Sequence, residues 1–419
     1  MSRLQAEHLY KVFGRRPEDA VRKLQAGAGR DELRAEGTTA AVIDASIEVG
    51  EGQIFVVMGL SGSGKSTLLR MLNGLLEPTA GTVRFDGQDL TSLSDKELRA
   101  VRSRKISMVF QHFALFPHRS VLENAAYGLE VQGVARAERE RRATEALELA
   151  GLKGWEKSWP DELSGGMQQR VGLARALATD ADLLLMDESF SALDPLIRRD
   201  MQDQLLELQK TLKKTIVFIT HDLNEAMRLG DRIAVMRDGR IVQTGTAEDI
   251  LVRPANDYVA SFIQDVDRSR VLTAGAVMTD VDSVLGTTTQ DGTELTTAAD
   301  FRAAAPATVG PDTPLADLFA ACSASDVPVA VTDEHGQLAG AVTGDRLLAV
   351  LGEPGRPVAP AAPAAPAAPA APAAPAAPAA ALPGARTGSA GAADAAPAGG
   401  PAAGSGSSDE TDGTVAADA

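Results

Sequence analysis

The chain has 419 residues, of which 44% are hydrophobic, and its net charge at pH 7 is −16. This length is enough for two or three globular domains. A single cysteine, Cys322, excludes an internal disulfide, and the sequence has no apolar run long enough to cross a bilayer. We therefore expect a protein of a reducing compartment that neither spans a membrane nor is exported by a signal sequence.

The acidic charge is concentrated toward the end of the chain. From Asp265 onward there are 19 acidic and 6 basic residues, whereas every lysine lies before that point. Such a change in charge predicts a domain boundary, so we expect one domain over residues 1–264 and a second over residues 265–353. The acidic balance also argues against a nucleic-acid-binding protein, which would normally present a basic face.

The first 264 residues alternate short apolar runs with longer helical patterns, which is typical of an α/β domain. Three runs, QIFVVMG, DLLLMDE and TIVFITH, are predicted to be buried strands because turn or capping residues follow each of them. The charged, helix-prone residues 15–38 are predicted to be a helical insertion in an early sheet. Pro17 can open a helix there, and Gly27 and Gly29 can end it.

The segment GLSGSGKST, residues 59–67, follows the first of these strands and begins a helical sequence. It fulfils the phosphate-loop pattern G-x-x-x-x-G-K-[ST] in the strand–loop–helix context that the pattern requires. Its glycines let the backbone N–H groups turn toward a β-phosphate, while Lys65 would bridge the β- and γ-phosphates and Ser66 would hold Mg²⁺. The alternative is a glycine-rich turn that binds nothing.

A second segment, ELSGGMQQRVGLARAL, has the composition of a helix start that attracts an anion. A serine and two glycines precede apolar positions at helical spacing, about a hundred residues after the phosphate loop. The unpaired N–H groups and the positive dipole end of such a start favour phosphate. The sequence therefore offers two phosphate-binding segments in one chain.

Polar side chains also stand where predicted strands end. Asp187 and Glu188 end the run LLLMDE, His221 ends TIVFITH, and Gln111 follows the run MVF. Ligands of open parallel sheets bind at the carboxyl ends of strands. Asp187 is placed to enter a Mg²⁺ shell, and Glu188 is placed to polarise an attacking water. Taken singly, these residues could equally be turn or structural residues.

The order of these segments is more informative than any one of them. The phosphate loop, Gln111, LSGGMQQR, LLLMDE, SALD and His221 occur in the order and approximate spacing of the nucleotide-binding subunits of ATP-binding-cassette (ABC) transporters. LSGGMQQR is similar to that family's signature and is far more specific than a phosphate loop. The resemblance covers roughly residues 1–264 and implies an α/β phosphate-loop ATPase core with a helical subdomain, binding ATP and Mg²⁺.

The resemblance also explains the two phosphate-binding segments. It implies that two copies pack head to tail, with each ATP between the phosphate loop of one copy and the signature helix of the other. Ser164 and Gly166 would face the γ-phosphate held by the partner, so hydrolysis would release the contact between copies. The family further suggests that Phe13 stacks on adenine, although Tyr10 is close by in the sequence.

Residue by residue, the resemblance implies three sets of roles. Nucleotide contacts fall on Phe13, Gly59, Ser61, Gly62, Ser63, Gly64, Lys65, Ser66, Thr67, Gln111, Ser164, Gly165, Gly166 and Asp194. Metal contacts fall on Ser66, Gln111 and Asp187, and hydrolysis on Glu188, His221 and Lys65.

Longer segments narrow the resemblance. YKVFGRRPEDA, the insertion, FSALDPLIR and PANDYVASFI are similar to the ATPases of glycine betaine/proline uptake systems. That subfamily imports compatible solutes during osmotic stress. The resemblance implies an ATPase on the cytoplasmic side of the cell membrane that drives a separate integral-membrane permease, with a solute-binding protein as an indirect partner.

Other readings are an ATPase of another amino-acid or quaternary-amine importer, a soluble non-transport ABC protein, and a ligand sensor with a degenerate ATPase. The single signature and the lack of sustained heptads disfavour the soluble protein. The intact Lys65, Asp187, Glu188 and His221 disfavour the sensor.

Residues 307–351 are predicted to run strand, helix, strand, turn, strand and helix, and they resemble one CBS module. Such modules pair, but the partner expected within residues 271–302 looks truncated. The family often places a ribose-binding aspartate three residues after a strand-end threonine. Here Arg346 stands three residues after Thr343, and Asp345 is one residue early. A regulatory nucleotide and a degenerate dimerisation module are therefore both open.

Residues 354–419 have low complexity. From 357 to 378 a proline stands at every third position, mostly as Pro-Ala-Ala. Because proline fixes φ and donates no hydrogen bond, this stretch is predicted to be a stiff, extended spacer. The Gly/Ala/Ser/Asp-rich remainder cannot build a core and is predicted to be disordered.

Overall fold

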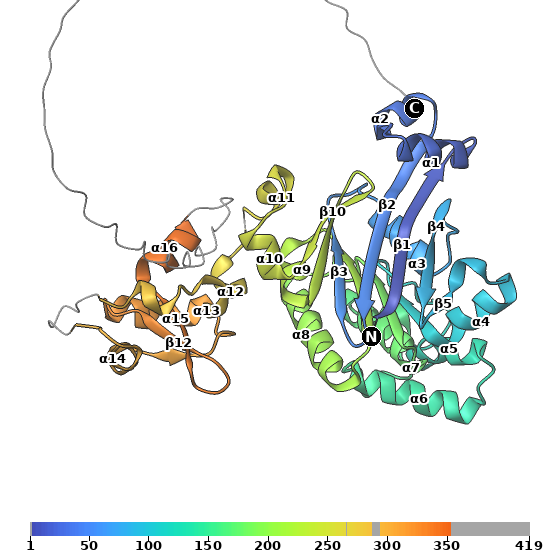
Figure 1. Ribbon diagram of the computed structural model, residues 1–419. Helices are drawn as coiled ribbons and strands as arrows, with labels where there is room; N and C mark the ends of the chain where they lie inside the picture. Colours follow the sequence, from blue (N-terminus) through green and yellow to red (C-terminus); the bar gives the residue numbers. More distant parts are fainter. Residues whose placement is uncertain (1, 265, 287–293, 353–419) are drawn as a thin grey trace, which may run out of the picture. The chain divides into compact units, whose positions relative to one another are not determined.

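The computed structural model of the chain describes residues 2–264, 266–286 and 294–352 (Figure 1). The predicted spacer and disordered tail, residues 354–419, lie outside the described residues, as do residues 287–293 of the second region.

An antiparallel sheet with the strand order β2-β1-β4-β5 holds the start of the chain. Its strands are β1 (Ser2–Phe13), β2 (Thr39–Gly50), β4 (Ala80–Phe85) and β5 (Gln88–Asp89). Two helices, α1 (Pro17–Gln25) and α2 (Arg30–Ala35), lie between β1 and β2, where the helical insertion was predicted. Pro17 is the first residue of α1, and Gly27 follows its end with a φ of +101°.

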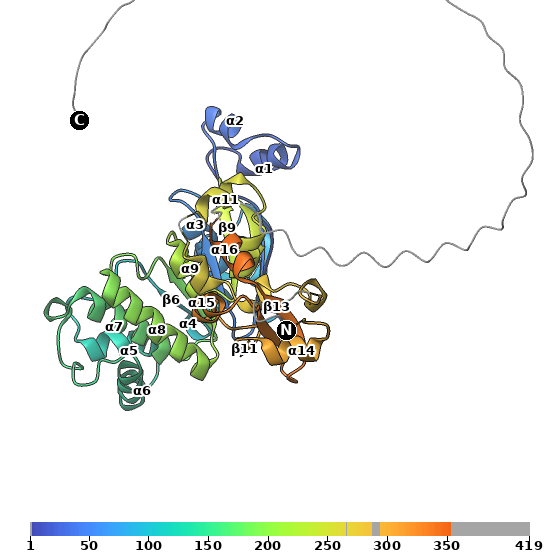
Figure 2. The same ribbon diagram turned by 90° about the vertical axis from the view of Figure 1, so that its left-hand side faces the viewer.

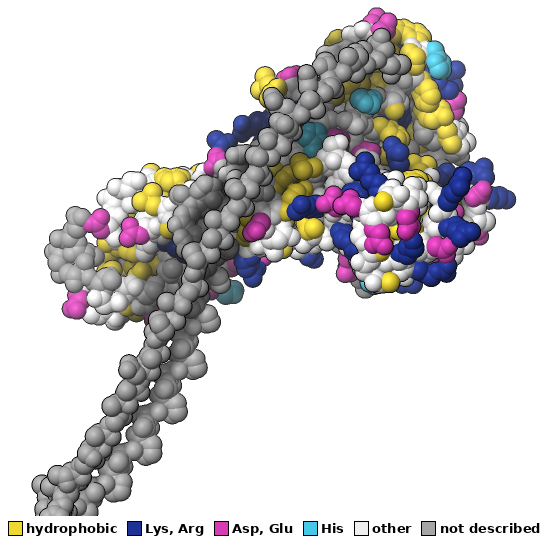
Figure 3. All heavy atoms as spheres, turned by 90° about the horizontal axis from the view of Figure 1, so that it is seen from above, with side chains coloured by type: hydrophobic (Ala, Val, Ile, Leu, Met, Phe, Trp, Pro, Cys, Tyr) yellow, Lys and Arg dark blue, Asp and Glu magenta, His cyan; other side chains and the backbone are white. Residues whose placement is uncertain are grey.

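The insertion is anchored by a small apolar cluster of its own. Val21, Leu24 and Leu33 pack with Tyr10 and Ile43 of the flanking strands. Outside this cluster, basic and acidic side chains are mixed over the surface of the insertion, and ion pairs such as Lys23–Glu36 join them (Figure 3). The insertion therefore combines a buried base with a highly charged exterior.

A six-stranded sheet with the order β10-β9-β3-β8-β7-β6 forms the centre of the ATPase-like domain. Its strands are β3 (Ile54–Met58), β6 (Ile106–Val109), β7 (Leu183–Asp187), β8 (Thr215–Thr220), β9 (Arg232–Arg237) and β10 (Arg240–Gly245). All neighbouring pairs are parallel except β10 with β9. The three apolar runs predicted to be strands are β3, β7 and β8.

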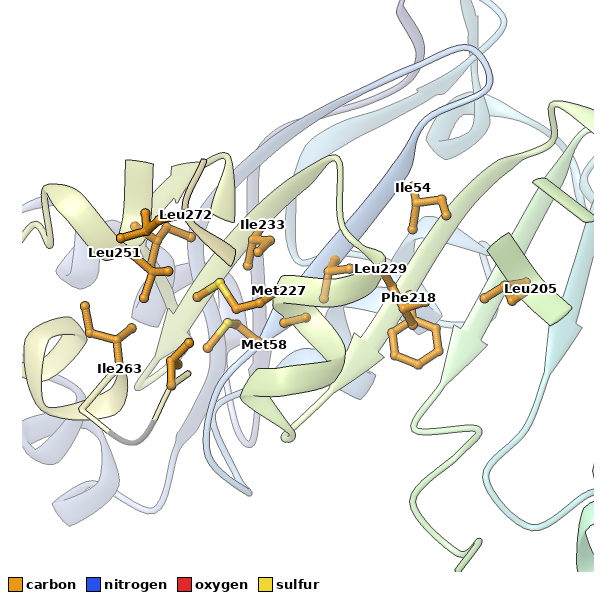
Figure 4. Packing of buried hydrophobic residues seen from close by; sticks show 14 of the residues in the cluster. Ile54, Met58, Leu205, Phe218, Met227, Leu229, Ile233, Leu251, Ile263 and Leu272 are labelled. Carbon is orange, nitrogen blue, oxygen red and sulfur yellow. The ribbon is translucent and has the colours of Figure 1, made fainter. Parts of the chain in front are cut away.

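Both faces of the central strand are buried, as its continuous apolar sequence requires. Ile54, Val56 and Met58 point into one apolar cluster, whereas Phe55 and Val57 point into another. This alternation follows from the two-residue period of a strand. Figure 4 shows part of the first cluster, in which side chains of the sheet meet those of the helices that follow it.

The helices of this domain fall into two groups. Those around the sheet are α3 (Lys65–Leu72), α8 (Pro195–Leu212), α9 (Leu223–Leu229), α10 (Ala247–Val252) and α11 (Asp257–Phe262). A helical subdomain contains α5 (Val121–Val131), α6 (Arg136–Leu149) and α7 (Gly165–Ala178), whereas α4 (Asp95–Lys105) packs against the sheets through Leu98 and Val101. Figure 2 shows α5, α6 and α7 together, and a cluster of alanine, leucine and valine side chains joins these three helices.

The second region contains a three-stranded sheet. Its helices are α12 (Arg268–Val271), α13 (Ala274–Val277), α14 (Ala298–Ala304), α15 (Leu315–Ala324) and α16 (Gly344–Gly352), and its strands are β11 (Thr308–Val309), β12 (Val329–Thr332) and β13 (Leu338–Val342). The run β11-α15-β12-β13-α16 has the order of elements predicted for residues 307–351. The described part of the preceding half has helices and two isolated β-bridges but no strand of its own.

Candidate functional site

The phosphate loop connects β3 to α3 at the carboxyl end of the central strand. Its three glycines all have positive φ, +150° at Gly59, +77° at Gly62 and +105° at Gly64. A Cβ atom at Gly59 would lie 2.2 Å from the carbonyl oxygen of Met236, and one at Gly64 would lie 2.3 Å from that of Ala41. The loop can therefore hold this shape only with glycine at these two positions.

Lys65, the first residue of α3, points back into the loop. Its side chain is 4% exposed, and Nζ donates hydrogen bonds to the carbonyl oxygens of Gly59 (2.9 Å) and Leu60 (3.2 Å). Nζ also lies 3.5 Å from Oε1 of Glu188. A buried ammonium group with these partners is a fixed positive charge at the mouth of the loop, where an anionic ligand would meet it.

Two acidic side chains stand beside this charge at the end of β7. Ser66 Oγ donates a hydrogen bond to Oδ1 of Asp187 at 2.9 Å. Burial raises the pKa of the Asp187 carboxyl from its ordinary value, although the bond from Ser66 acts in the opposite direction. Oε2 of Glu188 lies 2.9 Å from Nδ1 of His221, which follows the neighbouring strand β8. The predicted residues of β3, β7 and β8 are thus in direct contact.

Gln111 reaches the same edge of the sheet through an intermediary. Its Nε2 donates to Oγ of Ser191 at 3.3 Å, and that hydroxyl in turn donates to the backbone carbonyl of Glu188 at 2.8 Å. Gln111 lies two residues beyond the end of β6, the edge strand next to β7. The link therefore runs from one strand end to the next.

The signature segment stands apart from the phosphate loop. Ser164 is the N-cap of α7 and accepts a hydrogen bond from the backbone N–H of Met167 at 3.4 Å. Ser164 and Gly165 are exposed, whereas Gly166 is buried, and a Cβ atom on it would lie 2.5 Å from Cγ2 of Ile197. Among the described residues, no hydrogen bond or ion pair joins residues 164–166 to residues 59–67.

Comparisons with known proteins agree with this arrangement. A family model described as ABC transporter matches residues 42–191. The glycine betaine transport ATP-binding protein OpuAA of Bacillus subtilis is 49% identical over 83% of this chain and 92% of its own length. The trimethylamine N-oxide transport system ATP-binding protein TmoW of Ruegeria pomeroyi is 51% identical over 65% of this chain and 81% of its own.

A solved dimeric structure of the ATP-binding cassette MJ0796, bound to ADP and phosphate, is also similar. It is 33% identical to this chain, with a TM-score of 0.50, and the match covers 58% of this chain and 98% of that one. The chain belongs to the ATP-binding proteins of ABC transporters. It is therefore an ATPase, and the predicted phosphate-loop α/β core and ATP as its ligand are confirmed.

In this ABC ATPase, Phe13 and Tyr10 of β1 differ in whether their rings could stack on adenine. Phe13 pairs with Thr39 at the end of β1 and is 44% exposed, with Lys11 Nζ 5.4 Å from its ring centre. Tyr10 is 6% exposed because the insertion helices cover it. Of the two, Phe13 alone offers a ring face to a ligand.

Asp194 lies on the signature side of the structure, as the N-cap of α8. Its carboxylate accepts a hydrogen bond from the backbone N–H of Ile197 at 3.1 Å. Among the phosphate-loop serines, the hydroxyl of Ser63 is buried with no hydrogen-bond partner within the described part of the chain. Of the other predicted nucleotide contacts in this segment, Ser61 is exposed and Thr67 is half-buried.

Two residues of the ABC ATPase were not among the predicted site residues. Ser191 joins Gln111 to Glu188, and Arg175 of α7 contacts the loop that follows Gln111. Ser191 opens the SALD segment, so its position carried some signal. Arg175 carried none, because its partners are backbone carbonyl groups, which any sequence supplies.

In the second region, the residues expected at a nucleotide site form hydrogen bonds within the region itself. Thr343 Oγ1 accepts a hydrogen bond from the backbone N–H of Arg346 at 3.1 Å, which caps α16. Arg346 Nε donates to the carbonyl oxygen of Val277 at 3.4 Å, and Asp345 is exposed. These side chains hold their own helix and its neighbour.

Proposed function

We propose that this ABC ATPase is the energy-coupling subunit of an importer of glycine betaine and related compatible solutes. The observation that carries the proposal is the match to OpuAA, which continues over 83% of this chain and hence beyond the ATPase domain. No residue of an ATPase subunit needs to touch the solute, so the solute class rests on the relatives.

We propose further that the protein works as a head-to-tail dimer. Ser164 and Gly165 present an exposed helix start that contacts no phosphate loop within its own described chain. A helix start of this kind favours an anion, and the γ-phosphate bound to a second copy is a suitable one. The burial of Gly166 under Ile197 suits a supporting role, leaving Ser164 and Gly165 for direct contact.

We assign Mg²⁺ to Ser66, Asp187 and Gln111. The donors are side-chain oxygen atoms at the start of α3 and near the carboxyl ends of β6 and β7, and Mg²⁺ prefers oxygen ligands. The ion usually keeps several waters besides one or two carboxylates and the phosphates. Among the described residues, no group of three or more His, Cys, Asp or Glu side chains is placed to hold a metal ion by itself, so water and the phosphates would supply the remaining ligands. When bound, Mg²⁺ neutralises charge on the β- and γ-phosphates.

The hydrolytic roles follow from the contacts around Glu188. Its carboxylate would accept a proton from the water that attacks the γ-phosphate, while the 2.9 Å contact with His221 orients it. Lys65, fixed by two carbonyl groups, would bind the β- and γ-phosphate oxygens. In that state the attraction of Lys65 for Glu188 would be shared with the phosphates.

The partner that the ATPase drives would be an integral-membrane permease. No helix of the described residues is long and apolar enough to cross a membrane. The relatives are ATP-binding proteins of transport systems, which supports a permease as a separate chain, with the ATPase bound to its cytoplasmic side and a solute-binding protein acting indirectly. For the second region, the hydrogen bonds that Thr343 and Arg346 form within the region favour packing or dimerisation over a nucleotide sensor.

The test is uptake by vesicles that contain this ATPase and a permease that co-purifies with it. ATP inside the vesicles should drive accumulation of labelled glycine betaine, and unlabelled proline betaine should compete. A second candidate, import of trimethylamine N-oxide, is favoured by the 51% identity to TmoW. Uptake of trimethylamine N-oxide without uptake of glycine betaine would replace the first proposal with the second.

A further inference from the structure

The loop that follows Gln111 has an unusual backbone. Phe113 and Ala114 are consecutive non-glycine residues with positive φ, +56° and +49°. For residues with a Cβ atom this left-handed region is costly, and it persists only where surrounding contacts impose it. The loop is therefore held in shape from outside.

Asn124 of α5 holds the far end of the loop through the backbone N–H and carbonyl of Phe116, and Arg175 of the signature helix α7 holds its left-handed residues. One guanidinium nitrogen donates to the carbonyl oxygen of Ala114 at 2.6 Å, and the other donates to that of Phe113 at 3.1 Å. Burial lowers the pKa of the Arg175 guanidinium, and no carboxylate within the described residues forms an ion pair with it. The planar guanidinium group of arginine can donate to two adjacent carbonyl groups at once, which the ammonium group of lysine does less well.

The loop also touches the beginning of the same helix. A Cβ atom on Gly165 would lie 3.7 Å from Cζ of Phe113, and one on Gly172 would lie 3.6 Å from the carbonyl oxygen of Phe113. Gly165 is the second residue of the exposed helix start at Ser164. The loop thus lies along α7 from the signature residues to Arg175.

The other end of the loop reaches the hydrolytic residues. Gln111 donates to Ser191, and Ser191 donates to the carbonyl oxygen of Glu188. A continuous path of hydrogen bonds and backbone therefore joins Glu188 to α7. The two ends of this path act on different ATP molecules in a head-to-tail dimer. Glu188 acts on the ATP bound to its own chain, and the start of α7 contacts the ATP bound to the partner.

We propose that Arg175 is a positioning residue that seats the Gln111 loop on the signature helix and so couples the two ATP sites of the dimer through each single chain. The proposal rests on the ATPase roles and the head-to-tail dimer assigned above. Removing Arg175 should leave both half-sites present but let the loop, and with it Gln111, leave the position that hydrolysis requires.

The first experiment compares Arg175→Gln with Arg170→Gln in the full chain. Arg170 is a matched control, since it lies on the same helix and donates to a carbonyl oxygen, that of Ala150, and to Gln204, but not to the loop. Arg175→Gln should lower kcat for ATP about tenfold while changing KM less than about threefold. An equal loss in Arg170→Gln would reduce Arg175 to a general stabiliser of α7 and overturn the proposal.

A double-mutant cycle with Gln111→Ala separates positioning from a structural role. If Arg175 acts through Gln111, Arg175→Gln should lower kcat by less than about twofold once Gln111 has been removed. Additive losses would show that Arg175 acts by another route, and the proposal would fail. Both outcomes are read relative to wild-type ATPase activity, so an inactive wild type would count against the proposed function and not against this inference.

A rescue tests the strain directly and does not depend on the stability of one variant. Glycine adopts the φ of Ala114 without cost, so Ala114→Gly in the Arg175→Gln chain should recover at least about threefold in kcat. Arg175→Lys, which keeps the charge but loses the fork, should lie between wild type and Arg175→Gln. No recovery with Ala114→Gly, together with full activity of Arg175→Lys, would assign the effect to charge alone and contradict the proposal.

Discussion

The polar side chains of the ATPase domain and those of the second region differ in the partners they bind. In the ATPase domain, hydrogen bonds and ion pairs cross the fold: Ser66 meets Asp187 across 121 positions, and His221 meets Glu188 across 33. In the second region, a bond that crosses the fold ends on the backbone, as Arg346 Nε donates to the carbonyl oxygen of Val277 across 69 positions. The side chain of Thr343 bonds to a backbone N–H three residues away. Asp333 likewise accepts hydrogen bonds from N–H groups two and four residues further along.

This difference teaches how to tell a ligand site from a scaffold. Long-range contacts among charged groups at one sheet edge preorganise a site at a cost in stability, because like charges and buried carboxylates are brought together. The raised pKa of Asp187, caused by its burial, is one sign of that cost. Short-range capping and turn bonds only stabilise the elements that contain them. The comparison can be tested from both sides.

The largest effect is expected for Glu188→Gln. Loss of the group that accepts the proton of the attacking water should lower kcat at least 100-fold, within the range of about 10²–10⁴ for general-base removal. ATP binding should persist, and the protein should accumulate as an ATP-bound dimer in size-exclusion chromatography. Glu207→Gln, at an exposed position of α8, is the control. A Glu188→Gln chain that keeps more than about a tenth of wild-type kcat would contradict the assignment.

The next effect concerns a surface within the ATPase domain, the loop HFALFPH. Phe113, Leu115 and Phe116 are all half-buried; Phe113 and Leu115 pack against apolar clusters, and the Phe116 ring lies tilted against Tyr127 with ring centres 4.5 Å apart. If this surface receives the permease, Phe116→Glu should reduce co-purification with the permease at least about tenfold. The isolated ATPase should stay folded and active, as should Leu149→Glu, an exposed apolar position on α6. Unchanged co-purification would place the permease contact elsewhere.

A smaller effect is expected at the adenine. Phe13→Ala should raise the KM for ATP about tenfold, because stacking of a base on an aromatic ring contributes about 1–3 kcal/mol. Tyr10→Leu, which removes the aromatic ring but keeps an apolar side chain, should leave KM unchanged, since Tyr10 is covered by the insertion. Steady-state kinetics with ATP measure both variants. The reverse result, with only the Tyr10 variant affected, would mean that the insertion opens when nucleotide binds.

On the other side of the comparison, Thr343→Ala should act on stability alone. Loss of an N-cap costs about 1 kcal/mol in the free energy of unfolding, while Thr343→Ser should keep most of it. Urea unfolding measures the change, and calorimetric titration with ATP, ADP and AMP into the Glu188→Gln chain measures nucleotide binding. A second nucleotide site that is lost in Thr343→Ala would show that the second region also binds a ligand, and would contradict the comparison.

The smallest effect is expected for a chain that ends after Gly355. Residues 356–419 carry no aromatic side chain and little that could form a core. ATPase activity, solute uptake and its response to osmotic shift should therefore all match the full chain. Normal ATP hydrolysis combined with a lost osmotic response would make the tail a regulator.

Much of the ATPase domain could be predicted because its signals are local. A buried parallel strand is a continuous apolar run, and the phosphate loop needs glycines at fixed spacing. Phe13 was suggested by the resemblance alone, and the burial of Tyr10 could not be predicted, since it depends on the register between β1 and β2 and on the insertion that covers Tyr10. The contacts of Arg175 were equally hidden, because carbonyl acceptors leave no trace in a sequence.

The apolar cluster in Figure 4 has a consequence for how the chain is made. It begins at Ile54 in the central sheet and passes through Leu251 and Ile263 to Leu272 and, beyond the figure, Val350. During synthesis at about 5–20 residues per second, the ribosome needs roughly 4–16 s to add the 79 residues from Leu272 to Val350. For that time Arg268, which donates a hydrogen bond to the carbonyl oxygen of Val350, lacks that partner. The end of the growing chain thus exposes apolar side chains of the cluster, which a chaperone can bind until the rest of the second region has been made.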